Sequence, residues 1–502
     1  MELDLRQTVL ERYCTVLETV VSREETSESI VPDALPDAAR LISVDCTACI
    51  NGKECTAGTV RLTGTLMITA LYLPDGGGDV TAMTVKQPFQ CGCDTPQISA
   101  DCQAQAAVLS AAGSGKLLNP RKLFLKGELR VLLRVYAPEQ SSVSCAMADE
   151  GQDIQQRCQT CLDHAAVAVL EKPFLFSDVL RPSASKPPME TLLSAEVRTG
   201  VLDVKYIGRR LICKGVMTLS ALYSTAGQTS CAEFELPYSQ VMDFEGSFEE
   251  GEPDPLIALQ SVSCRLADGE LEVTVEALLQ AVLWCSRQVT ALCDLYSTKT
   301  ALDTEYCSST LCTYRTRESR HESVRQFCPL DVPAKQVLRC TAAVLSLEEK
   351  NGAEGFRYEA EAELTALCLS ESGALYSTTC LLSVVCAPES GQTYAHHCCC
   401  SCTDAGAVPV TGGLELRLEA EFIVVTEQRE ALQTVSSVRE SGRPRSSLPR
   451  PAVILRPVRS GEMLWDIAKA CGAAIADICA VNQLESEEVQ SGQRLLIPAC
   501  RP

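Results

Sequence analysis

Apolar and polar side chains alternate along most of this chain, and the pattern predicts β-strands. Between Glu54 and Tyr72 the alternation includes many β-branched residues, and it ends at a glycine-rich stretch, residues 75–79. Such a pattern is typical of a strand, a hairpin loop and a second strand. Three later segments alternate with one charged face, which predicts half-buried antiparallel strands. They are residues 123–136, 271–284 and 414–425.

The first residues follow a longer period. Val9, Tyr13, Val16 and Val20 recur at helical spacing, with charged residues between them. Residues 1–28 are therefore predicted to form one amphipathic helix that packs on the domain after it. Two Pro-Asp pairs follow this segment and predict an extended, turn-rich entry to the first strand.

The alternating pattern is repeated along the chain. Gly64 and Tyr72 recur as Gly215 and Tyr223 at one constant separation, and a third, more divergent copy places Cys368 at the tyrosine position. The chain has 502 residues, which is enough for three or four domains. We therefore expect three tandem antiparallel β domains, with boundaries at 29–150, 165–300 and 318–438.

The C-terminal part has a different pattern. Residues 439–451 are rich in Arg, Pro and Ser with almost no core residues, which predicts an extended linker. In the following module, residues 452–499, one apolar face at helical spacing predicts a helix over 463–471 that Gly472 can end by a left-handed cap.

A second short helix, residues 475–482, and two flanking strands complete this module in the order β-α-α-β. The strands are expected at 453–458 and in the segment that ends at Pro498. The predicted fold class is therefore mostly β, with three tandem antiparallel domains followed by a small α+β domain.

The C-terminal module resembles a LysM domain. Residues 460–468 are similar to the family motif Gly-Asp-Thr-Leu-Trp-x-Ile-Ala, Asn482 matches the asparagine after the second helix, and residues 491–498 resemble the Pro-Gly-Gln-x-Leu-x-Ile-Pro ending. LysM domains bind N-acetylglucosamine polymers such as peptidoglycan in a groove between two loops. The resemblance implies a site formed by Gly461, Glu462, Met463, Leu464, Trp465, Asn482, Gln483, Leu484, Gly492 and Gln493.

Two departures from the motif favour a protein ligand over a glycan. Glu462 and Met463 stand where the family has Asp and Thr or Ser, so a helix-capping hydroxyl and a sugar contact are lost. Methionine suits adaptable protein contacts. The alternative site is an apolar rim made of Met463, Leu464, Ile475, Leu484 and Val489.

The repeated domains also resemble a known family. The two Pro-Asp pairs, Gly64, Tyr72, the Pro88-Phe89 pair and residues 118–122 are similar to SPOCS (DUF3794) domains. SPOCS repeats with one C-terminal LysM domain resemble the SipL-type spore-coat morphogenetic proteins. The resemblance implies a non-catalytic scaffold, made in the mother cell and placed at the forespore surface. Its LysM region would bind the coat basement-layer ATPase, stage IV sporulation protein A, alongside other coat proteins.

Composition narrows the function classes further. Asp and Glu number 65 against 44 Lys and Arg, and the net charge of −21 argues against nucleic-acid binding. No apolar run is long enough for a membrane span, and no export signal is visible, so we expect a cytoplasmic protein. Its 29 cysteines are then expected to stay reduced and to pack as small apolar side chains.

Candidate chemistry is weak, and we expect no enzyme activity, metal or cofactor. Gly113–Lys116 departs from a phosphate-binding loop and predicts only a flexible loop. Cys158, Cys161 and His164 have ligand-like spacing without an adjacent fourth donor. Residues 396–402 gather six His and Cys, but neighbours on a strand face opposite ways. Exposed cysteines are instead candidates for cross-linking after the cell lyses.

Overall fold

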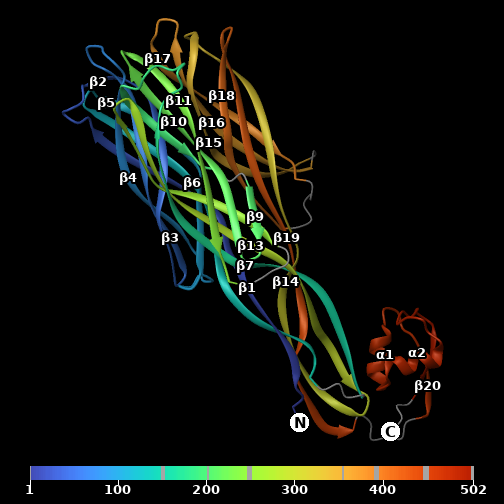
Figure 1. Cartoon of the computed structure of the whole chain (residues 1–502). Coiled ribbons are helices and arrows are strands. Elements are labelled where there is room, and N and C mark those ends of the chain that lie inside the picture. The colour runs from blue at the N-terminus through green and yellow to red at the C-terminus, as the bar shows by residue number, and fades with distance from the viewer. Residues whose placement is uncertain are drawn as a thin grey trace.

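The computed structural model describes residues 2–148, 153–200, 203–245, 251–352, 355–388, 395–444 and 451–498. Antiparallel strands make up an elongated body and a narrower stalk, and a small helical module lies beside the end of the stalk (Figure 1). None of the helices in the described part of the chain is long and apolar enough to span a bilayer.

The body contains three similar units, each a sandwich of two sheets. Unit 1 consists of β1 (Leu5–Ile30), β2 (Ala38–Thr56), β3 (Thr59–Pro74), β4 (Thr81–Asp94), β5 (Gln103–Asn119) and β6 (Lys122–Met147). Unit 2 consists of β7 (Ile154–Leu180), β8 (Thr191–Arg198), β9 (Asp203–Ile207), β10 (Arg210–Thr225), β11 (Gln228–Asp243), β12 (Glu252–Ala267) and β13 (Glu270–Ser297). Unit 3 consists of β14 (Thr300–Pro329), β15 (Ala334–Gly352), β16 (Gly355–Ser370), β17 (Leu375–Cys386), β18 (Ala395–Val410) and β19 (Gly413–Pro444).

The strand order is the same in every unit. One sheet of each unit has the order β2-β3-β4, β8-β10-β11 or β15-β16-β17, and in unit 2 β9 also pairs with β10. The other sheet, which contains the longest strands, has the order β1-β6-β5, β7-β13-β12 or β14-β19-β18. The pair Tyr13 and Ala166 joins the long-strand sheets of units 1 and 2 into one six-stranded sheet. The predicted mostly β fold of three antiparallel units is therefore confirmed.

The predicted N-terminal helix is wrong, because β1 is a strand of 26 residues that pairs with β6 along its length. A β-bulge between Thr15 and Leu17 shifts the alternation by one residue. The spacing of Tyr13 and Val16 therefore imitates a helix although both lie in a strand. β7 and β14 are the equivalent first strands, so units 2 and 3 begin before residues 165 and 318.

The end of unit 3 also differs from the expectation. β19 continues to Pro444 and pairs with β14, with Arg439 opposite Asp303. Residues 439–444 are therefore strand rather than linker, and 445–450 lie outside the described residues. The predicted flexible loop at 113–116 is also wrong, because it lies within β5.

The repeated sequence motif has a packing explanation. Gly64 pairs with Phe89, and a Cβ on Gly64 would lie 2.3 Å from the Phe89 ring and 2.3 Å from a backbone oxygen. Gly215 and Tyr238 repeat this arrangement in unit 2. Glycine is needed at both positions because the aromatic ring of the neighbouring strand covers it.

Replacing Gly64 with alanine should therefore destabilise the protein by about 1–3 kcal/mol, the usual range for overpacking. The control is Gly406→Ala, because a Cβ there would meet nothing within 4 Å. Urea unfolding followed by circular dichroism measures both. Equal midpoints for the two variants would contradict the proposed ring-over-glycine contact.

In each unit a tyrosine hydroxyl holds the turn that precedes the first strand of one sheet. Tyr72 donates its hydroxyl to the carbonyl oxygen of Pro36 at 3.0 Å, and Tyr223 does the same to Pro187. Unit 3 has Cys368 at this position, but its cross-strand partner Tyr376 donates to a carbonyl of the equivalent turn at 2.8 Å. Unit 3 therefore makes the equivalent hydrogen bond with a tyrosine of the neighbouring strand.

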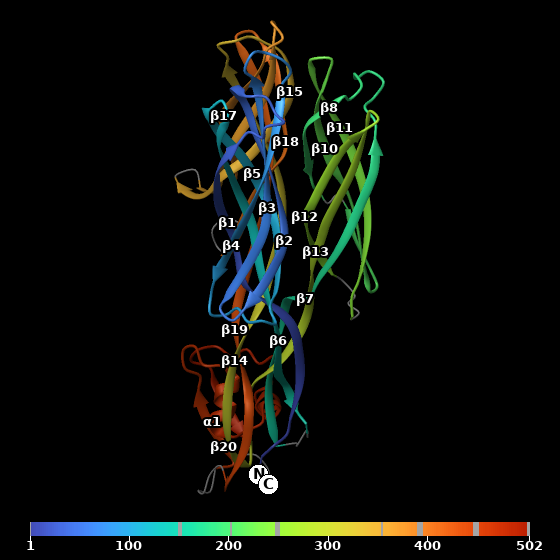
Figure 2. The same ribbon diagram turned by 90° about the vertical axis from the view of Figure 1, so that its left-hand side faces the viewer.

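The three units surround a common axis, and each contacts both others (Figure 2). Leu71, Leu222 and Leu367, which precede the tyrosine position in each unit, meet in one buried cluster. The ends of the paired strands β1·β6, β7·β13 and β14·β19 continue away from the body as the stalk. The stalk core contains residues from all three pairs, including Leu10, Val143, Val289, Leu311 and Leu432.

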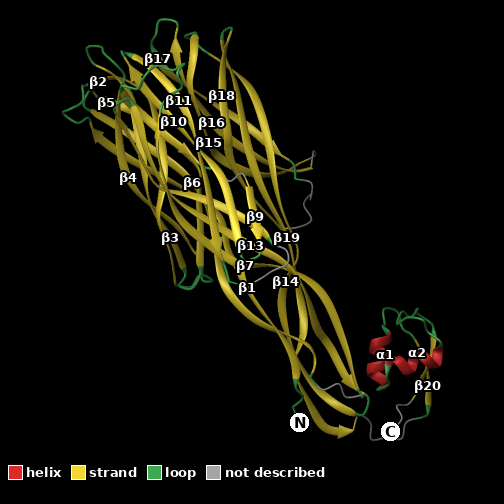
Figure 3. Cartoon of the chain, in the orientation of Figure 1, coloured by secondary structure: helices red, strands yellow, loops and turns green. Residues whose placement is uncertain are grey.

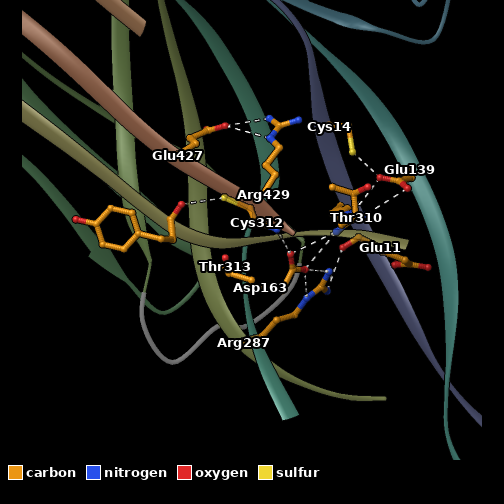
Figure 4. A network of polar contacts seen from close by, with 12 residues as sticks. Glu11, Cys14, Glu139, Asp163, Arg287, Thr310, Cys312, Thr313, Glu427 and Arg429 are labelled. Carbon is orange, nitrogen blue, oxygen red and sulfur yellow. Dashed lines mark hydrogen bonds and ion pairs between the residues drawn. The ribbon is translucent and has the colours of Figure 1, made fainter. Parts of the chain in front are cut away.

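Buried carboxylates join the three units across this axis. Asp163 is fully buried and accepts hydrogen bonds from Arg12 of unit 1, Arg287 of unit 2 and the backbone N–H of Cys312 of unit 3 (Figure 4). The donor–acceptor distances are 3.3, 3.1 and 3.3 Å.

A second network lies nearer the body. Asp254 of unit 2 pairs with Arg134 of unit 1 at 2.8 Å and with Arg317 of unit 3 at 3.0 Å. Arg315 of unit 3 lies 3.8 Å from the same carboxylate, and its guanidinium stacks over Trp284, 3.6 Å from the ring centroid. The buried carboxylate of unit 2 therefore neutralises arginines of units 1 and 3.

Candidate functional site

The C-terminal module has the predicted order β-α-α-β. It consists of β20 (Val453–Pro457), α1 (Leu464–Cys471), α2 (Ile475–Asn482) and β21 (Arg494–Pro498), and the two strands pair antiparallel (Figure 3). Gly472 ends α1 in the left-handed conformation at φ 61°, as its sequence position predicted. Leu464, Ile467, Ile478, Leu495 and Ile497 form its core.

The polar residues predicted for the site hold the module's own loops. The Glu462 carboxylate pairs with Arg456 and accepts the backbone N–H of Arg459 at 3.0 Å. The Asn482 amide donates to the carbonyls of Ile478 and Leu496 at 2.8 and 2.7 Å and accepts the Leu496 N–H at 2.8 Å. Both side chains therefore have structural hydrogen bonds inside the module.

The start of α1 lacks a capping hydroxyl, as the sequence predicted. Met463 is the N-cap residue, and its side chain makes no cap hydrogen bond. The Asp466 carboxylate accepts the Met463 N–H at 3.2 Å instead. The Met463 side chain is 53% exposed and faces solvent.

Several predicted apolar contact residues are core residues, which corrects the prediction. Leu464 and Trp465 are 1% and 5% exposed, and Ile475 is 9% exposed. Leu484 and Val489 pack partly against the same core. These side chains are committed to the fold, so Met463 is the exposed member of the proposed rim.

Two loops of the predicted site lie next to each other. The Gly492 N–H donates to the Val458 carbonyl at 2.9 Å, and the Val458 N–H donates to the Gln493 carbonyl at 2.8 Å. Gly461, Gln483 and Gly492 are exposed in left-handed turns, with φ between 56° and 86°. These turns offer a ligand exposed backbone together with the exposed side chain of Gln483.

The sequence of the module matches an established domain family over residues 458–498, the LysM domain. Residues 458–498 form a LysM domain. The match does not extend to the three units, so their resemblance to SPOCS domains stays a prediction. No curated protein and no solved structure matches the chain.

The LysM domain docks onto the stalk through one carboxylate of β13. Asp294 accepts hydrogen bonds from Trp465 Nε1 at 2.7 Å, from Lys469 Nζ at 2.6 Å and from the Tyr306 hydroxyl at 2.8 Å. Burial opposes ionisation of Asp294, but these donors, Lys469 foremost, outweigh it and lower its pKa. Asp294 is therefore an ionised carboxylate that holds the LysM domain on the stalk.

Aromatic contacts complete this docking. The ring of Trp465 packs edge-on against Tyr296 with centroids 5.1 Å apart, and the Tyr296 hydroxyl donates to the Ala473 carbonyl at 2.8 Å. The guanidinium of Arg157 lies 5.6 Å from the Trp465 ring centroid. Trp465 therefore faces the stalk rather than an outside ligand, which corrects its predicted place in the groove.

The LysM domain exposes an apolar face that the sequence reasoning missed. Leu455 and Leu496 lie opposite each other on β20 and β21 and are 60% and 41% exposed, and Val453 on the same face is 48% exposed. The sequence contains a sign of this face, namely two runs of three consecutive apolar residues, Val453-Ile454-Leu455 and Leu495-Leu496-Ile497. In a strand, such residues face both sides of the sheet.

Many of the cysteines are buried thiols of low reactivity, whereas Cys158 and Cys307 are exposed. Burial raises the pKa of Cys213, Cys264 and Cys285 to about 11, so these thiols are protonated and poorly nucleophilic at neutral pH. Cys399 and Cys400 of the His- and Cys-rich segment are also buried. Within the described residues, no three His, Cys, Asp or Glu side chains are grouped to hold a metal ion.

Proposed function

We propose that this chain is a non-catalytic adaptor that docks another polypeptide on its LysM domain. The observation that carries the proposal is the exposed apolar face of β20 and β21, where Leu455 and Leu496 lie side by side. Exposed leucines on a small domain, in which Glu462 and Asn482 are already used in internal hydrogen bonds, favour protein contact.

The resemblance of the repeats to SPOCS domains supports a role for this adaptor in the assembly of a spore coat. The partner is then the coat basement-layer ATPase, stage IV sporulation protein A, bound at the forespore surface within the mother cell. The three units serve as a rigid support, because the docked LysM domain is held by Asp294 at a fixed position on the stalk. A fluorescent fusion is expected to form a ring around the forespore.

Leu496→Asp is the test of this docking face. A charge at the centre of an apolar contact should weaken binding of the ATPase at least about 10-fold. Surface plasmon resonance with the full chain measures the affinity. The matched control is Leu381→Asp on β17, which is 51% exposed and remote from the LysM domain. Equal affinities of Leu496→Asp and the unmodified chain would contradict the proposal.

The LysM match itself favours a second candidate, binding of peptidoglycan or another N-acetylglucosamine polymer. The exposed turns at Gly461, Gln483 and Gly492 would supply the contacts. Sedimentation of the full chain with purified murein or chitin separates the two functions. Tight retention that Leu496→Asp leaves unchanged, together with no affinity for the ATPase, would favour the glycan.

A further inference from the structure

A half-buried arginine, Arg130, whose buried Nη1 atom has no hydrogen-bond partner lies in the seam between units 1 and 3. Arg130 on β6 stands between Ser22 of β1 and Ser110 of β5 in the sheet register. Its neighbours Leu129 and Val131 point into the core of unit 1 and are 2% and 0% exposed. Because side chains alternate along a strand, Arg130 faces the other way, toward unit 3.

A cavity of about 220 Å³ adjoins Arg130 in this seam. Its inner side includes Ala343 and Val344 of unit 3, which are buried, and its outer side includes Ser22 and Glu24, which are exposed. This space is large enough for several water molecules or for one small organic or inorganic ion.

Arg130 differs from the buried arginines of the chain. Arg134, Arg315 and Arg339 each have a carboxylate within 4.0 Å, namely Asp254, Glu427 and Asp45. In the described parts of the chain, Arg130 forms no ion pair, and its buried Nη1 has no hydrogen-bond acceptor. A buried N–H group without an acceptor is costly, so a ligand that supplies an acceptor to Nη1 is the natural explanation.

The charged side chains around the cavity pair with one another and leave the Arg130 guanidinium free to bind a ligand. Glu24 and Glu128 at the mouth both pair with Lys126, and Arg23 pairs with Glu25. From unit 3, the thiols of Cys399 and Cys400 approach Arg130, but burial raises the pKa of both and keeps them neutral. Glu363 of β16 lies near Glu128, where burial and that carboxylate raise its pKa.

We propose that this cavity binds a small oxyanion, a carboxylate or a phosphate, on the guanidinium of Arg130. The planar fork of arginine matches two oxygens of such a group, and the Ser22 hydroxyl lies next to Arg130 in the sheet register. The bound anion would neutralise the Arg130 guanidinium and supply an acceptor to its buried Nη1. The site is independent of the LysM domain and of the proposed adaptor function.

Thermal unfolding of the full chain tests the site, with sodium acetate and sodium phosphate as probes against sodium chloride at equal ionic strength. The unmodified protein should show a saturable rise in Tm of about 2–4 °C with at least one oxyanion. Acetate and phosphate distinguish a carboxylate site from a phosphate site. Arg130→Met should abolish the difference, and Arg325→Met, at an exposed arginine of β14, should keep it.

Arg130→Met also has an expected result without any anion. Methionine fills a similar volume without a charge, so in chloride this variant should be as stable as the unmodified protein or more stable. A large loss of Tm in chloride would show that the protein itself satisfies Arg130 and would overturn the proposal. An equal oxyanion response in Arg130→Met and the unmodified chain would also overturn it.

Discussion

Asp254→Ala is expected to destabilise the protein by about 3–5 kcal/mol, the usual cost of removing one partner from a buried ion network. Asp254 is 2% exposed, and it is the carboxylate that Arg134, Arg315 and Arg317 share. Its loss leaves the guanidinium groups of Arg134 and of Arg315 and Arg317, from two units, close together without their shared carboxylate. Urea unfolding measured by circular dichroism should show a clearly lower midpoint.

The control is Asp203→Ala, because Asp203 is about half exposed and pairs only loosely with Lys205, at 3.6 Å. That change should alter stability by less than about 0.5 kcal/mol. Adding Arg134→Met to Asp254→Ala should recover part of the loss, since fewer charges then remain unpaired. Unfolding of Asp254→Ala at the same urea concentration as the unmodified chain would contradict the role assigned to this network.

The network also predicts how stability depends on pH. Burial alone would raise the pKa of Asp254, but Arg134, Arg317 and Arg315 outweigh it and lower the pKa below the ordinary 3.8. A carboxylate with a lowered folded pKa adds stability above its unfolded pKa and loses it as the pH falls through the folded value. The contribution of Asp254 should therefore be complete at pH 5 and fade only below pH 3.8.

Asp294→Ala is expected to release the LysM domain from the stalk without unfolding it. The change removes the acceptor for Trp465, Lys469 and Tyr306, while the LysM core contains almost entirely its own residues. Hydrogen bonds to a charged group contribute about 1.5–3 kcal/mol each, so docking should weaken by at least about 10-fold. Small-angle scattering and Trp465 fluorescence measure the release.

A matched control for this release is Asp303→Ala, an exposed aspartate on the neighbouring strand β14. Asp294→Asn keeps an acceptor for Trp465 but loses the charge that faces Lys469, so its effect should be intermediate. The pKa of Asp294 is also lowered, so docking should persist in mild acid and weaken below pH 3.8. An unchanged scattering profile for Asp294→Ala would show that other contacts hold the domain.

Local patterns predicted the LysM domain well because its elements depend on near neighbours. The apolar face from Leu464 to Cys471 and the cap at Gly472 lie within a few residues of one another, and both were found as expected. The glycine and tyrosine of the repeats were equally visible, and the structure gives their packing reason at Gly64 and Tyr72.

Prediction failed where a feature depends on residues far apart in the sequence. The bulge near Val16 made β1 look helical, and only pairing with β6 reveals it as a strand. Nothing local distinguishes Asp254 or Asp294 from the many other acidic residues of the chain. The buried place of Trp465 follows from Tyr296 and Asp294, which are distant in sequence.

The sequence by itself thus determined the elements, the threefold repetition and the LysM module, because alternation, glycine positions and helix caps act over short distances. The tertiary structure alone decided that the units enclose an axis, which acidic residues are buried there, and which face of the LysM domain stays free. Those outcomes depend on burial, and burial is a property of the whole folded chain. An aspartate in water contributes little to stability, whereas the same aspartate buried between two guanidinium groups contributes several kcal/mol.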